Sequence, residues 1–394
     1  MNTSERTTAA IVSLLYFVRM LGLFSILPVF TLAASKLYGS GPMLIGLTLG
    51  IYGLFQALLQ VPYGYLSDRF GRKPMLIAGL SIFIAGSLVA ALAERIEWVL
   101  VGRALQGSGA IAGVLLAVLA DGMRFEYRAR AMAMVGGSIG LAFGGSLVLG
   151  PLLYAYGGLQ ALFYLAALTG TLALLLVCLV LPGASNLMVD PAEGDDVSEA
   201  GAVSYRLQLQ MLNLSIFMNH YLLMSSFLVI PIMLSQFGVA IDEHAVYYLC
   251  ILLGSFLLML PLVIRWRGSL DILVKILPAI AVMLVGFLVL AWSPTLTLFV
   301  VAVLVFFVGF NYLEATLPAL VSKVAPSARR GSAMGFYSSS QFLGIFAGGS
   351  VGGVLIALTD ITTLLAVNAA LLMLWAGVLM VLQRGSNSPR SPAM

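Results

Sequence analysis

The chain has 394 residues, of which 61% are hydrophobic and only 9% are charged. Soluble globular domains average roughly 45–50% apolar and about 25% charged residues, so these few charges could not cover a water-soluble protein of this size. The composition excludes a soluble enzyme, a disordered chain and a nucleic-acid-binding protein, and the net charge of +4 comes from short basic clusters between long apolar runs. The two cysteines lie within such runs and indicate neither disulfides nor a metal site. The sequence predicts an integral membrane protein.

A membrane-spanning helix needs about 20 mainly apolar residues. The runs that meet this requirement are 8–34, 42–66, 75–93, 97–121, 131–155, 159–181, 207–234, 244–264, 272–291, 295–320, 331–357 and 361–382. Turn signals such as Gly157-Gly158 separate them. A β-barrel is excluded because its strands alternate apolar and polar residues over about ten positions. We therefore predict an all-α membrane protein with twelve transmembrane helices.

The positions of lysine and arginine predict which side of the membrane each loop faces. If the N-terminus is cytoplasmic, sixteen basic residues fall in inner segments, whereas only Lys36 and Arg95 fall in outer loops and Arg19 and Arg103 lie within spans. The excess of positive charge on cytoplasmic segments then places both termini in the cytoplasm of a multi-pass protein of the inner (cytoplasmic) membrane. A cleavable signal peptide is not expected, because the first apolar run is too long.

One long polar stretch, 182–206, divides the chain. Its acidic residues and lack of apolar runs predict a flexible cytoplasmic linker between a six-helix bundle, 1–181, and a second bundle, 207–394, that ends in a short cytoplasmic tail. The first helices of the two halves share a pattern, because Phe24 and Phe227 each precede a proline by four residues. This repeat is typical of two pseudo-symmetric halves that rock about a central site, although coincidence in apolar sequence is an alternative.

The loop after the second span reads Gly64-Tyr-Leu-Ser-Asp68-Arg69-Phe-Gly71-Arg72-Lys73. Gly64 lets another helix approach and Gly71 permits a tight turn, while an aspartate at position 68 suits the positive end of a helix dipole. A positive-inside anchor alone would explain the basic residues but neither Asp68 nor the glycines.

This loop resembles the signature of the major facilitator superfamily, G-x-x-x-D-R-x-G-R-[KR], over all ten residues. The resemblance implies two six-helix bundles that alternate between inward- and outward-open states. It also implies that Asp68 contacts the eleventh helix near Gly331-Ser332 and latches the outward-open state, and that Arg72 pairs with Asp121 at the inner end of the fourth helix.

The fourth span carries Arg103-Ala-Leu-Gln106-Gly107-Ser-Gly109-Ala110, similar to a second motif of that family, R-x-x-Q-G-x-G-A. An arginine inside a span costs about 2.5–3.5 kcal/mol on insertion scales, so Arg103 should face a polar interior or extend to the outer interface. The spacing of 18 residues is five helical turns, which puts Arg103 and Asp121 on one face of a continuous helix, about 27 Å apart.

The fifth span resembles the antiporter motif of the drug:proton antiporter branch in part. Gly137, Gly150 and Pro151 match it, whereas Ser146 replaces one glycine. Small residues also let helices pack closely, which is a purely structural explanation. Further segments around Arg19, Glu314 and Gln341 are similar to the YajR-type efflux transporters of that branch.

Four ionisable side chains lie within spans: Arg19, Arg103, His220 and Glu314. Such groups are candidates for a functional site, and the resemblance implies that their helices line a central cavity. Glu314 is the candidate proton carrier, with a structural hydrogen-bonding role as the alternative. Two arginines against one carboxylate favour neutral, amphipathic or anionic substrates over small dications.

Other residues could line the substrate cavity, although aromatic side chains in a bundle mostly pack. They are Tyr16, Gln106, Phe227, Phe310, Tyr312, Tyr337 and Gln341. No phosphate-binding loop, nucleophile triad or zinc-ligand spacing occurs in the sequence, so we expect no enzyme, no cofactor and no metal. We predict a monomeric secondary transporter, in which protons drive the efflux of a small-molecule drug or metabolite. Proton symport, uniport and a non-transporting membrane sensor are the alternatives.

Overall fold

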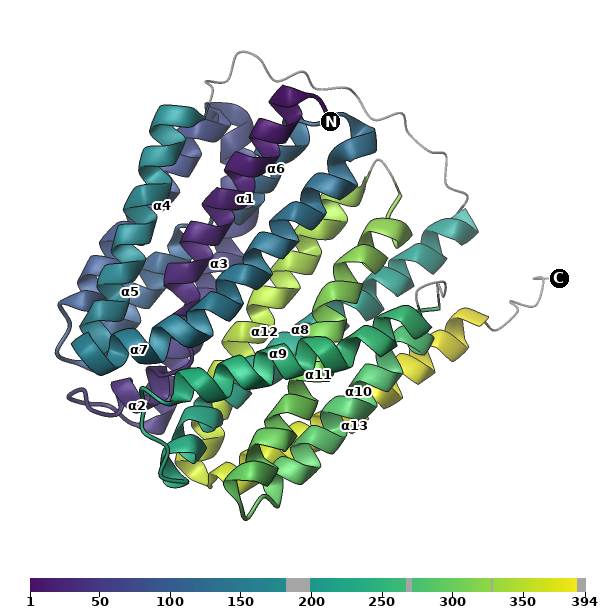
Figure 1. Cartoon of the computed structure of the whole chain (residues 1–394). Coiled ribbons are helices and arrows are strands. Elements are labelled where there is room, and N and C mark those ends of the chain that lie inside the picture. The colour runs from purple at the N-terminus through teal and green to yellow at the C-terminus, as the bar shows by residue number, and fades with distance from the viewer. Residues whose placement is uncertain (182–198, 267–270, 327–328, 388–394) are drawn as a thin grey trace. The chain divides into compact units, whose positions relative to one another are not determined.

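The apolar runs form helices because in hydrocarbon the backbone must satisfy its hydrogen bonds within each segment. The computed structural model describes residues 1–181, 199–266, 271–326 and 329–387. Over that part of the chain the structure is helical (Figure 1). An isolated bridge between Tyr38 and Arg95 is the only extended pairing among the described residues. The helices are α1 (Thr3–Phe24), α2 (Phe30–Ala34), α3 (Pro42–Phe70), α4 (Arg72–Ala91), α5 (Ile96–Ser108), α6 (Ala112–Asp121), α7 (Phe125–Val180), α8 (Glu199–Gln236), α9 (His244–Arg265), α10 (Ile272–Ala291), α11 (Leu296–Val324), α12 (Arg330–Leu358) and α13 (Ile361–Asn387).

Eleven stretches of the described chain are long and apolar enough to cross a membrane. One of them is α7, which contains both the fifth and the sixth predicted spans. Within α7, Gly158 adopts φ 63° and ψ −162°, a conformation that favours glycine and marks the predicted turn. The all-helical membrane fold and its apolar segments are therefore confirmed.

Two predicted spans are interrupted. The first is divided into α1 and α2 around Pro28, and the fourth into α5 and α6 by residues 109–111. The expectation of one straight helix from Arg103 to Asp121 is therefore wrong, because the chain leaves helical geometry at Gly109, whose ψ is 55°. Pro28 lies in the break between α1 and α2, whereas its predicted counterpart Pro231 lies inside the continuous helix α8.

The described residues pack as two compact units. The first contains Met1–Pro191, Met224–Leu249 and Ile345–Leu358, and the second contains Ala192–Leu223, Cys250–Gly344 and Thr359–Met394. In the first unit α7 packs along α1 and α4, and α5 packs against α3 and α4. In the second unit α10 packs between α11 and α13. The predicted boundaries at 181 and 207 stay a prediction, and residues 182–198 and 388–394 of the expected linker and tail lie outside the described part.

The first unit includes parts of α8, α9 and α12 that meet α2, α3 and the break before α2. Thr31 donates a hydrogen bond to the carbonyl of Phe227 (3.1 Å), and Tyr248 donates one to the carbonyl of Pro28 (3.0 Å). An ideal Cβ on Gly353 of α12 would lie only 2.8 Å from the Cα of Gly46 on α3. Small residues thus bring these two helix backbones into direct contact.

Candidate functional site

The loop between α3 and α4 carries the signature residues. Arg72 forms an ion pair with Asp68, its Nε donates to Asp121 Oδ2 at 3.0 Å, and its Nη1 donates to Ser67 Oγ at 2.6 Å. Gly71 makes the turn with φ 93°. The Arg72–Asp121 pair is therefore present, and it joins α4 to the end of α6. The predicted contact between this loop and Gly331 stays a prediction.

The other loop residues differ in their surroundings. Lys73 donates hydrogen bonds from Nζ to the carbonyls of Cys178 and Leu181, both at 2.9 Å, and so caps the C-terminal end of α7. Arg69 lies over the ring of Phe70, and Gly64 has open space where a side chain would be. The expected approach of another helix to Gly64 stays a prediction.

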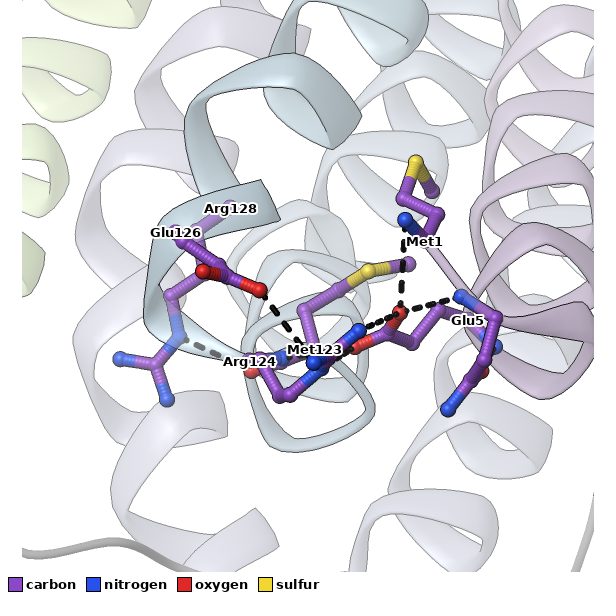
Figure 2. Close-up of polar contacts among 7 residues, drawn as sticks. Met1, Glu5, Met123, Arg124, Glu126 and Arg128 are labelled. Carbon is purple, nitrogen blue, oxygen red and sulfur yellow. Dashed lines mark hydrogen bonds and ion pairs between the residues drawn. The ribbon is translucent and has the colours of Figure 1, made fainter.

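An ion-pair network that the sequence analysis missed lies at the start of α1 (Figure 2). Glu5 is buried, forms a capping box with Asn2, and accepts a hydrogen bond from Arg124 Nε at 2.9 Å. Arg124 also pairs with Glu126 at 3.3 Å, and its hydrogen bond to Glu5 raises the pKa of its guanidinium. The Asn2-x-x-Glu5 spacing could have indicated the cap, but not a partner 119 residues away.

Arg19 of α1 is fully buried in the first unit. Its Nη2 donates to the carbonyl of Gly109 at 2.9 Å and approaches Tyr52 Oη and Gln56 Oε1, both at 3.4 Å. Gly109 begins the break between α5 and α6, so the guanidinium meets the negative end of the α5 dipole. Arg19 therefore holds the interrupted fourth span in place.

Arg103 of α5 is also buried, with an exposure of 1%. Its Nη1 donates to Gln106 Oε1 at 3.0 Å, and its guanidinium carbon lies 5.1 Å from the centre of the Tyr52 ring. Gln106 in turn donates to Ser87 Oγ at 2.8 Å. Arg103 thus faces the interior of the unit, and the alternative of an extension to the outer interface is wrong.

A second polar cluster lies within the second unit. Glu314 of α11 is 38% exposed at its side chain, and its Oε2 lies 3.4 Å from Asn219 Nδ2 and 3.8 Å from His220 Nε2. His220 Nε2 lies 2.8 Å from Gln341 Nε2, and its Nδ1 lies 3.3 Å from the carbonyl of Ile216. Asn219 was not among the predicted site residues, because a lone asparagine in an apolar span shows no spacing pattern.

These contacts fit a neutral histidine. A neutral imidazole with its proton on Nδ1 donates to Ile216 and accepts from the amide of Gln341. A second proton on Nε2 would oppose the Gln341 amide and favour the Glu314 carboxylate. The cluster can therefore exist in two proton states with different hydrogen bonds.

The predicted aromatic lining is buried rather than open. Tyr16, Phe227, Phe310, Tyr312 and Tyr337 are each at most 4% exposed. Tyr16 donates to the carbonyl of Ala112 at 2.6 Å, at the start of α6, and the ring of Phe310 packs against His220. Their present contacts are those of packing and support.

The residues of the fifth-span motif lie in α7. Gly150 meets the break between α1 and α2, where an added Cβ would lie 2.8 Å from Pro28 Cγ, and Pro151 is buried beside it. Gly137 has no atom within 4 Å of such a Cβ. In the part of the chain that the structure describes, no group of histidine, cysteine and carboxylate side chains could hold a metal ion.

The sequence profile of the Major Facilitator Superfamily matches residues 12–349, with a second match at 276–393. The chain belongs to this family. Inner membrane transport protein YajR of Escherichia coli K12 is 39% identical over 384 residues, which cover 96% of this chain and 84% of that protein. An uncharacterized transporter of Buchnera aphidicola subsp. Acyrthosiphon pisum is 32% identical over 351 residues, which cover 88% of this chain and 90% of the relative.

Solved structures of other transporters share the fold. The bacterial homologue of the human lysosomal transporter Spinster, in an inward-facing and unoccupied conformation, matches with a TM-score of 0.73 at 15% identity and full coverage of both chains. The human organic anion transporter MFSD10 matches with a TM-score of 0.70 at 18% identity, covering 96% of this chain and all of that one. This major facilitator protein is thus a multi-pass membrane transporter, and the proteins that it resembles are transporters rather than enzymes.

Proposed function

We propose that the protein exports a small molecule from the cytoplasm in exchange for protons, as members of the drug:proton antiporter branch do. In this proposal it acts as a monomer in the inner membrane, with both termini in the cytoplasm. Two six-helix halves alternate between inward- and outward-open states, and Asp68 with its loop latches the outward-open state. The 39% identity to an inner membrane transport protein supports the location.

The observation that carries proton coupling is the Glu314 cluster. Glu314 is a partly exposed carboxylate in a span, and a titratable histidine lies 3.8 Å away. Protonation of Glu314 removes a charge that Asn219 and His220 now contact, so each proton state favours a different arrangement of α8, α11 and α12. A proton moves a conformational equilibrium only through such a difference in affinity between two states.

The test is proton flux in inverted membrane vesicles energised to an acid interior. Lipophilic cations, neutral amphiphiles, sugars and organic anions are added in turn, and release of protons is followed with a pH-sensitive dye. We expect one class of compound to release protons from wild-type vesicles. Glu314→Gln should abolish this release but leave the protein folded, because the amide keeps the size of the carboxyl group and cannot carry a proton.

Glu94→Gln is the matched control, since Glu94 is an exposed carboxylate in the loop between α4 and α5. It should behave as wild type. Proton exchange at the wild-type rate in Glu314→Gln would remove Glu314 from this role. Transport of a compound without proton movement in the wild type would instead favour uniport, and binding without transport would favour a sensor.

A further inference from the structure

The two buried arginines of the first unit have more hydrogen-bond donors than acceptors around them. Arg19 Nε and Nη1, Arg103 Nε and Gln56 Nε2 are buried nitrogens with no hydrogen-bond partner among the described protein atoms. Buried polar groups in folded proteins are nearly always hydrogen-bonded. The unpartnered atoms of these three side chains are all donors. Their excess over acceptors indicates a binding site for a group that accepts hydrogen bonds.

These donors lie together because they share neighbours. Arg19 contacts both Gln56 and Tyr52, and the guanidinium of Arg103 lies over the same Tyr52 ring. The break at residues 109–111 is part of the cluster, because Arg19 donates to Gly109 just before α6 begins. The amide groups at the start of a helix favour a negative charge. Donors from α1, α3 and α5 therefore lie around Tyr52, and one of them, Arg19, also reaches the break before α6.

The charges of this region are not balanced by the protein. Arg19 and Arg103 are 0% and 1% exposed, and neither pairs with a carboxylate in the part of the chain that the structure describes. A buried guanidinium normally has an anionic or carbonyl partner, since burial of an unpaired charge is costly. Arg19 has one close carbonyl, that of Gly109 at 2.9 Å, and longer contacts to Tyr52 and Gln56. Arg103 has the side-chain oxygen of Gln106 at 3.0 Å and the carbonyl of Leu49 at 3.4 Å.

We propose that the cluster of Arg19, Gln56 and Arg103 binds the carboxylate or phosphate group of an anionic substrate. This inference rests on the proposed function, because the opening of the bundle during transport gives the substrate access to a cluster that is now closed. The planar guanidinium matches an oxyanion in a bidentate way, and the low dielectric of the interior strengthens the pair. A cationic substrate would be repelled by the same two charges.

The experiment measures anion binding to the purified full-length protein in detergent. The midpoint of thermal unfolding is followed as sodium benzoate or sodium phosphate is added, at ionic strength held constant with sodium chloride. Benzyl alcohol, which has a similar ring without the charge, is the neutral probe. We expect benzoate or phosphate to raise the midpoint with a saturable dependence on concentration, and benzyl alcohol to have no such effect.

Variants then locate the site. Arg103→Gln should weaken binding of the effective anion by about tenfold or more, because it removes a charge-assisted hydrogen bond to that anion. Arg103→Lys should restore part of the affinity. Arg95→Gln removes the same charge from an exposed outer loop, and it should bind as wild type. Arg19→Gln is expected to bind weakly but also to disturb the α5–α6 break. Its result is therefore interpreted only together with the results for Arg103→Gln and Arg103→Lys.

Three outcomes would overturn the inference. One is a wild-type protein that neither benzoate nor phosphate stabilises, which would mean that the donors serve the fold alone. Another is equal stabilisation by chloride, which would identify a simple halide site. The third is equal binding by wild type and Arg103→Gln. If proton-coupled transport of a cation is found at the same time, the proposed function stands and only the anionic substrate class fails.

Discussion

Two glycines of α7 belong to one predicted motif but have opposite surroundings. Gly150 lies against the break between α1 and α2, whereas Gly137 faces open space. Where another backbone or ring approaches closely, only glycine fits, because any side chain would overlap that neighbour. A glycine without such a neighbour can be replaced without a clash. The pattern of small residues in the sequence could not distinguish the two, because the partner of Gly150 lies more than 100 residues earlier in the chain.

We therefore expect Gly150→Ala and Gly137→Ala to differ in sign. The added methyl group at position 150 would overlap Ser25 and Pro28, and overpacking of this kind costs about 1–3 kcal/mol. At position 137 alanine meets nothing and is favoured over glycine in a helix by roughly 0.5–1 kcal/mol. Thermal unfolding of both purified variants in the same detergent measures the difference. Equal shifts would contradict the contact at Gly150.

The same distinction explains which site residues the sequence could predict. Arg19, Arg103, His220 and Glu314 were found because an ionisable side chain stands out in an apolar span. Asn219 and the Glu5–Arg124 pair were missed, because their meaning depends on partners that only folding brings near. A polar residue is thus visible in the sequence, but its hydrogen-bond partner is not, unless a family motif implies the pair, as it does for Arg72 and Asp121.

At the scale of elements, Lys73 connects the signature loop to the end of α7. Its ammonium group donates to two carbonyls that the helix leaves without intrahelical partners. The sequence predicts Lys73 as a cytoplasmic basic residue of the signature loop, but not its contact with α7. A positive charge at a helix C-terminus contributes about 0.3–1 kcal/mol, so the contact has a measurable local effect.

Lys73→Met should loosen the last turn of α7 and leave the rest of the protein unchanged. Methionine keeps much of the length of the side chain but cannot donate a hydrogen bond. Hydrogen–deuterium exchange read by mass spectrometry should show faster exchange for peptides that end near Leu181 and no change in α4. Lys73→Arg, which retains donors and charge, serves as the comparison. Unchanged exchange in Lys73→Met would mean that the cap is not formed.

The prediction of elements succeeded where length and apolarity decide and failed where the chain changes direction inside a span. All twelve apolar runs are mainly helical, since the bilayer allows little else. The breaks at 25–29 and 109–111 were not predicted. A proline such as Pro28 favours a bend in the first, whereas the second depends on Tyr16 and Arg19, which bind the backbone there from another helix.

At the scale of the whole molecule, the contact between α3 and α12 bears on the proposed alternation of states. It is built from glycine backbones, and Gly353 would meet Pro42 and Gly46 if it carried a side chain. Backbones in direct contact leave no room for side chains between them, so even a small residue separates the helices.

Gly353→Val should therefore open this contact. The reporter is Thr31→Cys in a background in which the exposed Cys178 and Cys250 are replaced by serine, because Thr31 is only 7% exposed beside Phe227. A membrane-impermeant maleimide added from outside should label it several times faster in Gly353→Val. Gly377→Val is the matched control, because nothing lies within 4 Å of a Cβ at that position in α13. Equal labelling of the two variants would contradict the prediction.

The same Thr31→Cys reporter also tests the proposed latch, for which we expect the opposite change in labelling rate. If Asp68 holds the outward-open state, Asp68→Asn lowers the time that the protein spends in it. Labelling of the reporter thiol from outside should then slow in Asp68→Asn relative to its parent. An unchanged rate would mean that the Asp68–Arg72–Asp121 contacts serve the fold of the first unit only.

The position of Arg19 has a consequence for biosynthesis. The chain enters the membrane from its N-terminus, so α1 is made before the groups that Arg19 binds on α3 and at Gly109. A lone arginine in a span raises the cost of insertion by about 2.5–3.5 kcal/mol until those partners arrive. We therefore expect α1 to stay beside the insertion machinery until α3 and α5 emerge, and to pass into lipid together with them.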